Sequence, residues 1–419
     1  MQLEGHPSCG CDDFRLSRRR FLRGLGAAGG AAVLTSLVGD TFTEIALGAD
    51  TSTNVLVVIS LRGGADGLSM VVPHGDPAYA TARPTIGIPR DSLIAQDDLF
   101  GLHPAFAPLL PQWNAGSLAA VHAVGLPQPN RSHFAAMELI EDADPGSTER
   151  RGWINRLVGT MGSADPVEAV QLGSGNTATS MFGSEPYLAL SDLLRLSIPS
   201  GGGVWEGPTR ESLAATYRSV GGPLGAGARA ALDVSARLAD LAQPAPPANG
   251  AVYPAGGLAS ALAQAARVVR RQIGARVVAV DAGGWDMHTQ MGMVGGGTMT
   301  SRVGELTQSL AAFWVDLGAH SEQVTVVTVS EFGRRVQQNA DSGLDHGYGN
   351  CMLAMGAGVN GGRYYARWPG LGAPSRVEGD LAVTVDYRSV LSELLASRFP
   401  DVSIPSVFPG FTRESVGVA

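Results

Sequence analysis

The chain has 419 residues, 44% of them hydrophobic and 16% charged, so it can bury a large core and global disorder is excluded. Its 56 glycines follow no Gly-X-Y repeat, which excludes collagen, and its net charge of −8 comes without a basic stripe, which argues against nucleic-acid binding. All 30 basic residues are arginine, which excludes Schiff-base and Walker-type lysine chemistry. The length predicts one large α/β domain with insertions, or two domains.

Residues 1–49 are predicted to be an export signal. Ser17–Arg23 (SRRRFLR) matches the twin-arginine pattern, an apolar stretch follows from Gly24 to about Val38, and small residues near 46–49 are typical of a cleavage site. The alternative, an arginine-rich amphipathic helix, does not explain all three features. We expect export by the twin-arginine translocase to the periplasm or the extracellular space. The mature chain, 50–419, would have no membrane span and would keep Cys351 alone, which excludes an internal disulfide.

Five short apolar runs predict the strands of a doubly wound, mostly parallel sheet. They lack polar alternation, so each is expected to be buried on both faces and covered by helices. Helical periodicity lies between them, and a Gly-rich or polar loop follows each run. Ligands of such sheets bind at the carboxyl ends of the strands, where these polar loops lie. The runs are 54–61, 118–124, 275–280, 324–329 and 351–355, and the periodic stretches include 134–141, 258–273 and 302–317.

The segment from about 192 to 257 has a different composition. It contains a glycine triplet at 201–203, helical patterns at 209–220 and 232–241, and a Pro-rich breaker at 244–247. These features predict a mostly helical insertion in the α/β domain, joined by a flexible linker.

Two polar motifs follow predicted strands and have the residue types of a metal site. Asp286 and His288 come shortly after the run 275–280, and an extended loop would point both at one centre. A carboxylate and an imidazole together bind Zn²⁺, Mn²⁺ or another divalent ion. Taken alone, a helix-capping aspartate and a merely polar histidine explain this motif more simply. Glu331 follows the run 324–329 and Asp345-His346 precedes the run 351–355, where a salt-bridged loop is the alternative.

Two further residues stand at positions that suit catalysis. Asp66 lies in the loop after the first predicted strand, although an aspartate before a glycine often only forms a turn. Ser132 lies at the start of the helical pattern 134–141, where a serine is most often an N-cap. The same position offers a nucleophile the helix dipole when it attacks an anionic centre. If all these residues meet at one sheet edge, they would form a metal-assisted hydrolase of anionic esters, with one or two cations.

The chain resembles the DUF1501 family of bacterial proteins, which are exported by the twin-arginine pathway and have no assigned reaction. That family is similar to the alkaline phosphatase and sulfatase superfamily, which implies its fold. The resemblance covers nearly the whole mature chain except the segment near 200–257. It rests on the motifs at 61–89, 103–113, 130–138 (NRSHFAAME), 281–288 (DAGGWDMH), 330–335 (SEFGRR) and 345–371.

The resemblance implies roles for individual residues. Asp66 matches the aspartate after the first strand, and Ser132 matches the nucleophile. Asp286 and His288 match an Asp/His loop with a shorter spacing, and His346 matches a late metal histidine. The remaining metal pair departs from the superfamily pattern, because Glu331 replaces its aspartate and Phe332 stands in place of its histidine. A single metal or a degenerate site is therefore an alternative to two metals.

We accordingly expect an exported, alkaline-phosphatase-like hydrolase of phosphate or sulfate esters. Ser132 would attack the ester, and Arg131 or Arg334 would bind the remaining oxygens of the anion. The expected cofactor is one or two ions of Zn²⁺, Mn²⁺, Mg²⁺ or Ca²⁺. The alternative is a non-catalytic envelope scaffold or binding protein with a co-exported partner protein. The expected metal residues are Asp66, Asp286, His288, Glu331, Asp345 and His346.

Overall fold

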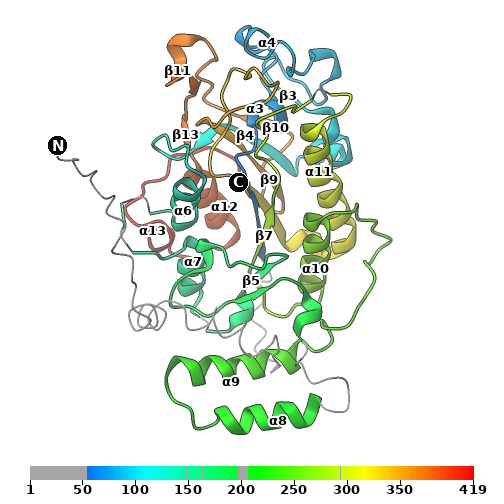
Figure 1. Ribbon diagram of the computed structural model, residues 1–419, viewed down its shortest axis with the longest axis vertical. Helices are drawn as coiled ribbons and strands as arrows, with labels where there is room; N and C mark the ends of the chain where they lie inside the picture. Colours follow the sequence, from blue (N-terminus) through cyan, green and yellow to red (C-terminus); the bar gives the residue numbers. More distant parts are fainter. Residues whose placement is uncertain are drawn as a thin grey trace, which may run out of the picture.

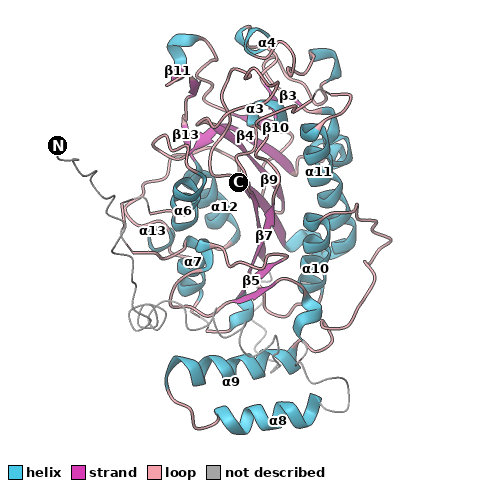
Figure 2. Ribbon diagram, in the orientation of Figure 1, coloured by secondary structure: helices cyan, strands magenta, loops and turns pink. Residues whose placement is uncertain are grey.

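The computed structural model describes residues 54–419 except 145, 148, 163, 197, 199–205 and 293. The predicted export signal, residues 1–49, lies outside the described residues. None of the described helices is long and apolar enough to cross a membrane. The described chain forms a central sheet with helices on both faces (Figure 1; Figure 2).

The main sheet has nine strands in the order β10-β4-β9-β8-β1-β7-β5-β6, with β13 paired to β4. Every strand except β9 runs in the same direction, which confirms the predicted doubly wound, mostly parallel α/β fold. All five predicted runs are strands of this sheet. Their bounds, with the others, are β1 Val55–Leu61, β4 Leu118–Gly125, β5 Ala169–Leu172, β6 Leu188–Leu190, β7 Val277–Ala282, β8 Val324–Val329, β9 Asn350–Gly356, β10 Arg363–Tyr365 and β13 Val385–Asp386.

The reversed direction of β9 decides where the site residues before it lie. β9 is antiparallel to both of its neighbours, β4 and β8. Its first residue, Asn350, therefore lies at the edge where the parallel strands end. The Asp345-His346 segment precedes Asn350, so it emerges at that same edge. A parallel β9 would have placed His346 at the opposite edge.

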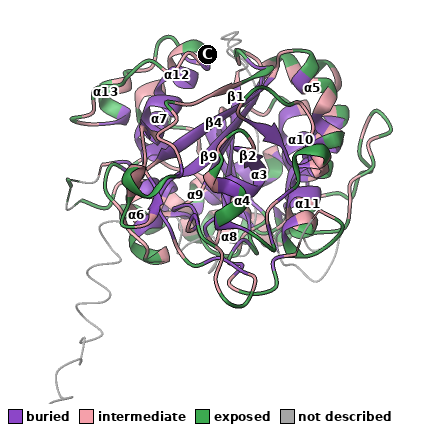
Figure 3. Cartoon of the chain, turned by 90° about the horizontal axis from the view of Figure 1, so that it is seen from above, coloured by how far each residue is buried: buried purple, intermediate pink, exposed green. Residues whose placement is uncertain are grey.

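Alternate residues of the central strand pack into two separate cores, as the two-residue period of a strand requires. Val57 and Ile59 face the core formed with α10 and α11. Leu56 and Val58 face the core formed with α6, α7 and α12. Burying each of these side chains contributes about 1.5–3 kcal/mol, so a strand buried on both faces is held firmly. Figure 3 shows the buried sheet between two helical layers whose outer sides are exposed.

The covering helices pack apolar side chains against the sheet, and three of the five larger ones lie where helical periodicity predicts them, over 134–141, 258–273 and 302–317. The larger ones are α6 His133–Asp142, α7 Trp153–Met161, α10 Gly257–Arg270, α11 Thr298–Leu317 and α12 Tyr387–Arg398. The shorter elements are α3 Gly67–Met70, α4 Ala78–Ala82, α5 Leu110–Asn114 and α13 Ile404–Val407, with the small pairs β2 Val71–Val72 and β3 Gly101–Leu102, and β11 Arg376–Val377 and β12 Asp380–Leu381.

The described part of the expected insertion consists of two helices, α8 Glu206–Tyr217 and α9 Gly222–Arg237. They lie together at one end of the molecule (Figure 1). α8 has no buried residue, whereas α9 packs Ala231 and Val234 against the core under α10. The helix α9 starts ten residues before the predicted 232–241 stretch. Its proline lies in the first turn, where a helix tolerates proline, so the proline does not prevent this earlier start. The predicted domain boundaries themselves stay predictions.

Candidate metal centre

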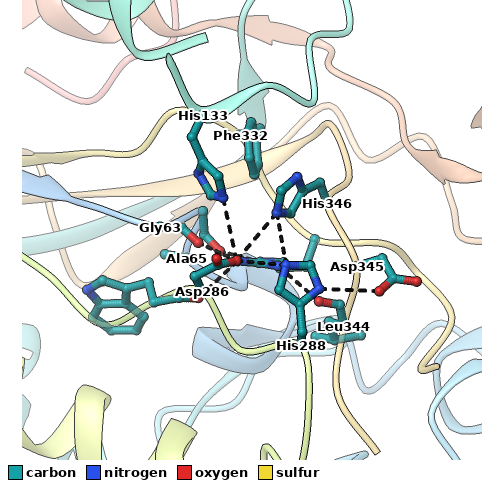
Figure 4. A network of polar contacts seen from close by, with 12 residues as sticks. Gly63, Ala65, His133, Asp286, His288, Phe332, Leu344, Asp345 and His346 are labelled. Carbon is teal, nitrogen blue, oxygen red and sulfur yellow. Dashed lines mark hydrogen bonds and ion pairs between the residues drawn. The ribbon is translucent and has the colours of Figure 1, made fainter. Parts of the chain in front are cut away.

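The loops that carry the polar motifs meet at one edge of the sheet. Ser60 of β1 lies opposite Asp281 of β7 and Val329 of β8, so these three strands end level with one another. The segments that follow them, 283–288 and 330–335 among them, therefore emerge side by side. The start of α6 and the segment before β9 reach the same place (Figure 4).

Three histidines surround one carboxylate oxygen at this edge. The Nε2 atoms of His133, His288 and His346 lie 3.5, 2.9 and 3.4 Å from Asp286 Oδ1. The Nε2 atoms of His288 and His346 are 3.0 Å apart. His133, Asp286 and His346 each offer an atom within 4.8 Å of those of the other two, and His288 adds a fourth beside two of them. We call these four residues the histidine cluster.

The opposite nitrogen of each ring is held by an oxygen acceptor. His346 Nδ1 donates to the carbonyl of Arg131 at 2.8 Å. His133 Nδ1 donates to Glu331 Oε1 at 2.9 Å, and His288 Nδ1 lies 3.3 Å from Asp345 Oδ1. These acceptors place the proton of a neutral imidazole on Nδ1 and leave a lone pair on Nε2. All three lone pairs then face the cluster.

A divalent cation fits this donor set. Lone pairs 3.0 Å apart repel each other unless a proton or a cation lies between them, and His133 Nε2 is buried without a hydrogen-bond partner. Ligand atoms that bind one tetrahedral ion at about 2.0–2.1 Å are spaced by about 3.3 Å, close to the spacings in the cluster. Partial burial lowers the pKa of His346, which keeps the ring neutral and able to bind a metal.

Asp286 is ionised and fixed by Arg334. Partial burial raises the pKa of Asp286, but the hydrogen bond and charge of Arg334 and the nearby histidines outweigh it, so the pKa lies below its usual value. The Arg334 guanidinium donates to Asp286 Oδ1 at 2.5 Å and is itself buried. Its remaining donors bind backbone carbonyls of three loops, those of Gly63, Gly64, Trp285 and Leu344. Arg334 thus connects the three loops through hydrogen bonds. The guanidinium donors that form these bonds are not free to bind the oxygens of an anion.

Glu331 and Phe332 support the cluster from behind. Glu331 is buried, accepts from Gly63 N at 2.8 Å and orients the ring of His133. Phe332 packs its ring 4.9 Å from that of His133 and 4.8 Å from that of His346. In this geometry Glu331 holds a ligand in place instead of facing the cation, and Phe332 fills the space beside the two rings with an apolar group.

The structure does not bring Asp66, Ser132 or the guanidinium of Arg131 into the cluster. Both carboxylate oxygens of Asp66 bind the buried Arg83, at 2.5 and 2.9 Å. Arg131 forms ion pairs with Glu378, at 2.8 Å, and with Asp380, so only its backbone carbonyl contacts the cluster. Ser132 is the exposed N-cap of α6, and its side chain forms no capping hydrogen bond.

His133 is the cluster residue that sequence reasoning missed. The segment 130–134 was interpreted as a nucleophile motif centred on Ser132, and the next residue was passed over. A histidine at the first position of a helix, directly after a strand-end loop, is the signal that could have found it. The other ligand candidates, Asp286, His288 and His346, were expected and do lie together, with Asp345 and Glu331 beside them.

A cleft of about 620 Å³ opens beside the cluster. His133, Asp286 and Glu331 form part of its wall, and the rest comes from α6, the Gly-rich segment after β7 and the segment after β5. A small organic molecule of ordinary size fits a cleft of this volume. The arrangement can therefore hold a cation at one end of a cleft that admits a ligand.

Comparison with known proteins defines the family. Among solved structures, the chain is similar to the C-terminal periplasmic domain of EcEptC from Escherichia coli, with 10% identity, 86% of this chain and 88% of that chain covered, and a TM-score of 0.36. It is also similar to the lipoteichoic acid synthase LtaP from Listeria monocytogenes, with 8% identity, coverages of 84% and 80%, and a TM-score of 0.34. No curated protein matches. Residues 111–389, about two thirds of the chain, match the model of the family described as "Protein of unknown function (DUF1501)", and the chain belongs to that family.

Proposed function

We propose that the protein is an exported, metal-dependent hydrolase of phosphate or sulfate esters. One observation carries the proposal: three imidazole Nε2 atoms and one carboxylate oxygen converge on a single point at the end of a cleft. Imidazole-rich sets favour Zn²⁺ or a similar transition metal over Mg²⁺ or Ca²⁺, which prefer all-oxygen ligands. One cation is therefore proposed, bound by His133, His288, His346 and Asp286.

Some residues of the chain would orient the metal ligands, and another would attack the ester. Because four protein ligands fill a tetrahedral site, a bound cation would supply Lewis acidity toward an ester oxygen by accepting it as an additional ligand. Glu331, Asp345 and the Arg131 carbonyl would hold the three rings in position, and Arg334 would hold Asp286. Ser132 remains the proposed nucleophile, because it is exposed at the N-terminus of α6 and directly precedes a cluster histidine.

Metal content and hydrolysis of the folded full-length protein test the proposal together. We expect about one equivalent of transition metal by mass spectrometry, and hydrolysis of p-nitrophenyl phosphate or sulfate that a chelator abolishes and Zn²⁺ restores. Metal content and ester hydrolysis should both fall in each of three variants, His133→Ala, His288→Ala and His346→Ala. His320→Ala is the control, since His320 lies between α11 and β8, away from the cluster. Unchanged metal content in all three variants would overturn the proposal.

A non-catalytic scaffold or binding protein, acting with a co-exported partner, is the second candidate function. Two observations favour it: Arg83 engages both oxygens of Asp66, and Ser132 is not part of the cleft wall. Ser132→Ala separates the two candidates. Loss of hydrolysis with full metal content supports the enzyme, whereas bound metal without hydrolysis of any phosphate or sulfate ester supports the scaffold.

A further inference from the structure

The part of the cleft wall outside the cluster is built from residue types that the metal site does not need. The helix α6 contributes Phe134 and Glu138, one and five residues after His133. The segment after β5 contributes hydroxyl and amide side chains, namely those of Ser174, Asn176, Thr177 and Thr179. The cleft wall thus combines one aromatic ring from α6 with a polar, uncharged segment after β5.

Phe134 has an unusual degree of exposure for a phenylalanine. It is 87% exposed, although it lies on the first turn of a helix that otherwise packs against the sheet. A phenylalanine ring has a large apolar area to bury, and leaving it in water forgoes that stabilisation. Phe134 lies in the cleft wall beside His133, where the flat face of its ring can stack on the apolar face of a bound ligand.

The polar segment has hydrogen-bonding capacity to spare. The side-chain amide of Asn176 is exposed and has no hydrogen-bond partner among the described residues. The backbone N–H of Thr179 donates to Glu141, while its hydroxyl is partly exposed at the cleft wall. Amide and hydroxyl groups both donate and accept, so they match a ligand that carries hydroxyl groups.

The charge of the cleft wall disfavours a ligand that carries a second anionic group in addition to its phosphate or sulfate ester. Arg62 is the cationic residue among those that line the cleft, and its guanidinium is already paired with Glu141 at 2.6 Å and Asp281 at 2.7 Å. Carboxylates of Glu138, Glu141, Asp281, Asp286 and Glu331 lie in the same wall. A second phosphate or sulfate group would meet repulsion there, so the part of the ligand away from the cluster is uncharged.

We propose that this cleft is a carbohydrate subsite: it binds the sugar alcohol of a phosphate or sulfate monoester. The ester group lies at the histidine cluster, one face of the sugar ring covers Phe134, and sugar hydroxyls bond to Asn176 and Thr179. The placement of the ester group rests on the proposed function, whereas recognition of the sugar depends on the cleft wall alone.

Two binding measurements on the full-length protein separate these parts. The first uses the Zn²⁺-loaded Ser132→Ala variant, which the proposed function expects to bind esters without hydrolysing them, in calorimetry with glucose 6-phosphate, glucose 6-sulfate, phosphocholine and inorganic phosphate. Glucose 6-phosphate should bind about tenfold more tightly than inorganic phosphate. Phe134→Ala should remove most of that gain and leave metal content and inorganic phosphate affinity unchanged. Val252→Ala is the matched control, because Val252 is 85% exposed and outside the cleft wall.

The second measurement needs no metal. Saturation-transfer NMR with methyl glycosides of glucose, galactose, mannose and N-acetylglucosamine should show contact with at least one sugar, lost in Phe134→Ala and kept in Val252→Ala. Sugar contact without metal or hydrolysis would overturn the proposed function and uphold the subsite. The subsite is overturned if no glycoside shows Phe134-dependent contact, or if phosphocholine binds more tightly than the sugar esters.

Discussion

Single residues show that different atoms of the cluster would bind a cation and hold the side chains in place. Each histidine uses one nitrogen for the centre and the other for a fixed oxygen partner. Arg334 holds Asp286 through Oδ1, the same oxygen that faces the three histidines, and it also joins the loops after β1 and β7 to the segment before β9. Side chains behind the ligands therefore set the geometry of the centre as much as the ligands do.

Replacing Arg334 by lysine should weaken metal binding without removing a ligand. Lysine keeps the charge but has a single terminal nitrogen, so several buried carbonyls lose their donor. We expect metal affinity to fall by roughly 10- to 100-fold and the free energy of unfolding to fall by on the order of 3 kcal/mol. Competition with a chelator and denaturant unfolding measure the two effects. Arg335→Lys is the control, since its side chain is 38% exposed, and equal metal affinity in the two variants would contradict this role for Arg334.

His122 should make the fold sensitive to acid. Burial lowers the pKa of His122 from its ordinary value of 6.5 to about 4. Its Nδ1 accepts from Ala123 N at 2.8 Å and its Nε2 donates to Val71 O at 3.0 Å, so protonation of Nδ1 breaks a buried bond. Because the folded pKa lies below the unfolded one, the unfolded state binds more protons as the pH falls from about 6.5 toward 4, and stability is lost over that window.

Denaturant unfolding at pH 7 and pH 5 tests this. His122 should account for a loss of about 2 kcal/mol in the free energy of unfolding between these two pH values. His122→Gln should be less stable at pH 7 but should lose less on acidification. The difference between the two proteins removes the contributions of groups that are the same in both, including His103, whose pKa burial also lowers to about 4. Parallel pH dependences would show that His122 is not responsible.

At the scale of elements, apolar composition predicted the strands well but carried no information on direction. β1, β4, β7 and β8 are continuous apolar runs, and each was expected within two residues at either end. The run that becomes β9 has the same composition, and its antiparallel direction depends on the path of the preceding loop. β5 and β6 were missed because they have only 4 and 3 residues.

The same reasoning explains which site residues could be predicted. Asp286, His288 and His346 lie in short polar motifs next to apolar runs, so the local sequence is enough to identify them as candidates. His133 has a weaker local signal, its position at the start of a helix, and its place among the ligand candidates depends on distant loops that meet it. The engagement of Asp66 by Arg83 likewise depends on packing between the first loop and the end of α4. Contacts between distant segments of this kind leave no pattern in a single sequence.

The α8–α9 pair should be the first described part of the mature chain that trypsin cuts. With no lysine in the chain, trypsin can cleave only after arginine. Arg218 is exposed in the connection between α8 and α9, and α8 buries no residue, so local opening there costs little. We expect a first cut after Arg218, identified by mass spectrometry, with the α/β body intact. Arg218→Gln should delay it, and an earlier cut after Arg276, next to β7, would contradict this prediction.

At the scale of the whole molecule, export is a prediction about residues 1–49, which lie outside the described structure. Replacing Arg18 and Arg19 by lysine should leave the protein in the cytoplasm with its leader uncleaved, because the twin-arginine pair is the recognised signal. Cell fractionation and the mass of the N-terminal peptide measure both. Arg15→Lys, outside the Ser17–Arg23 motif, is the control, and normal periplasmic accumulation of the double variant would contradict the prediction.

The spread of the ligands along the chain has a consequence for how the protein is made. His133 is synthesised early, the Asp286 loop well past the midpoint and His346 late, and β1, β7, β8 and β9 must all be in place before these residues meet. A nascent or half-folded chain therefore lacks the assembled cluster, and the proposed cation would bind only after the ribosome has released nearly the whole sheet. If the protein binds the proposed cation, metal loading would be the closing step of maturation, and a molecule that retains its ion would have completed its fold.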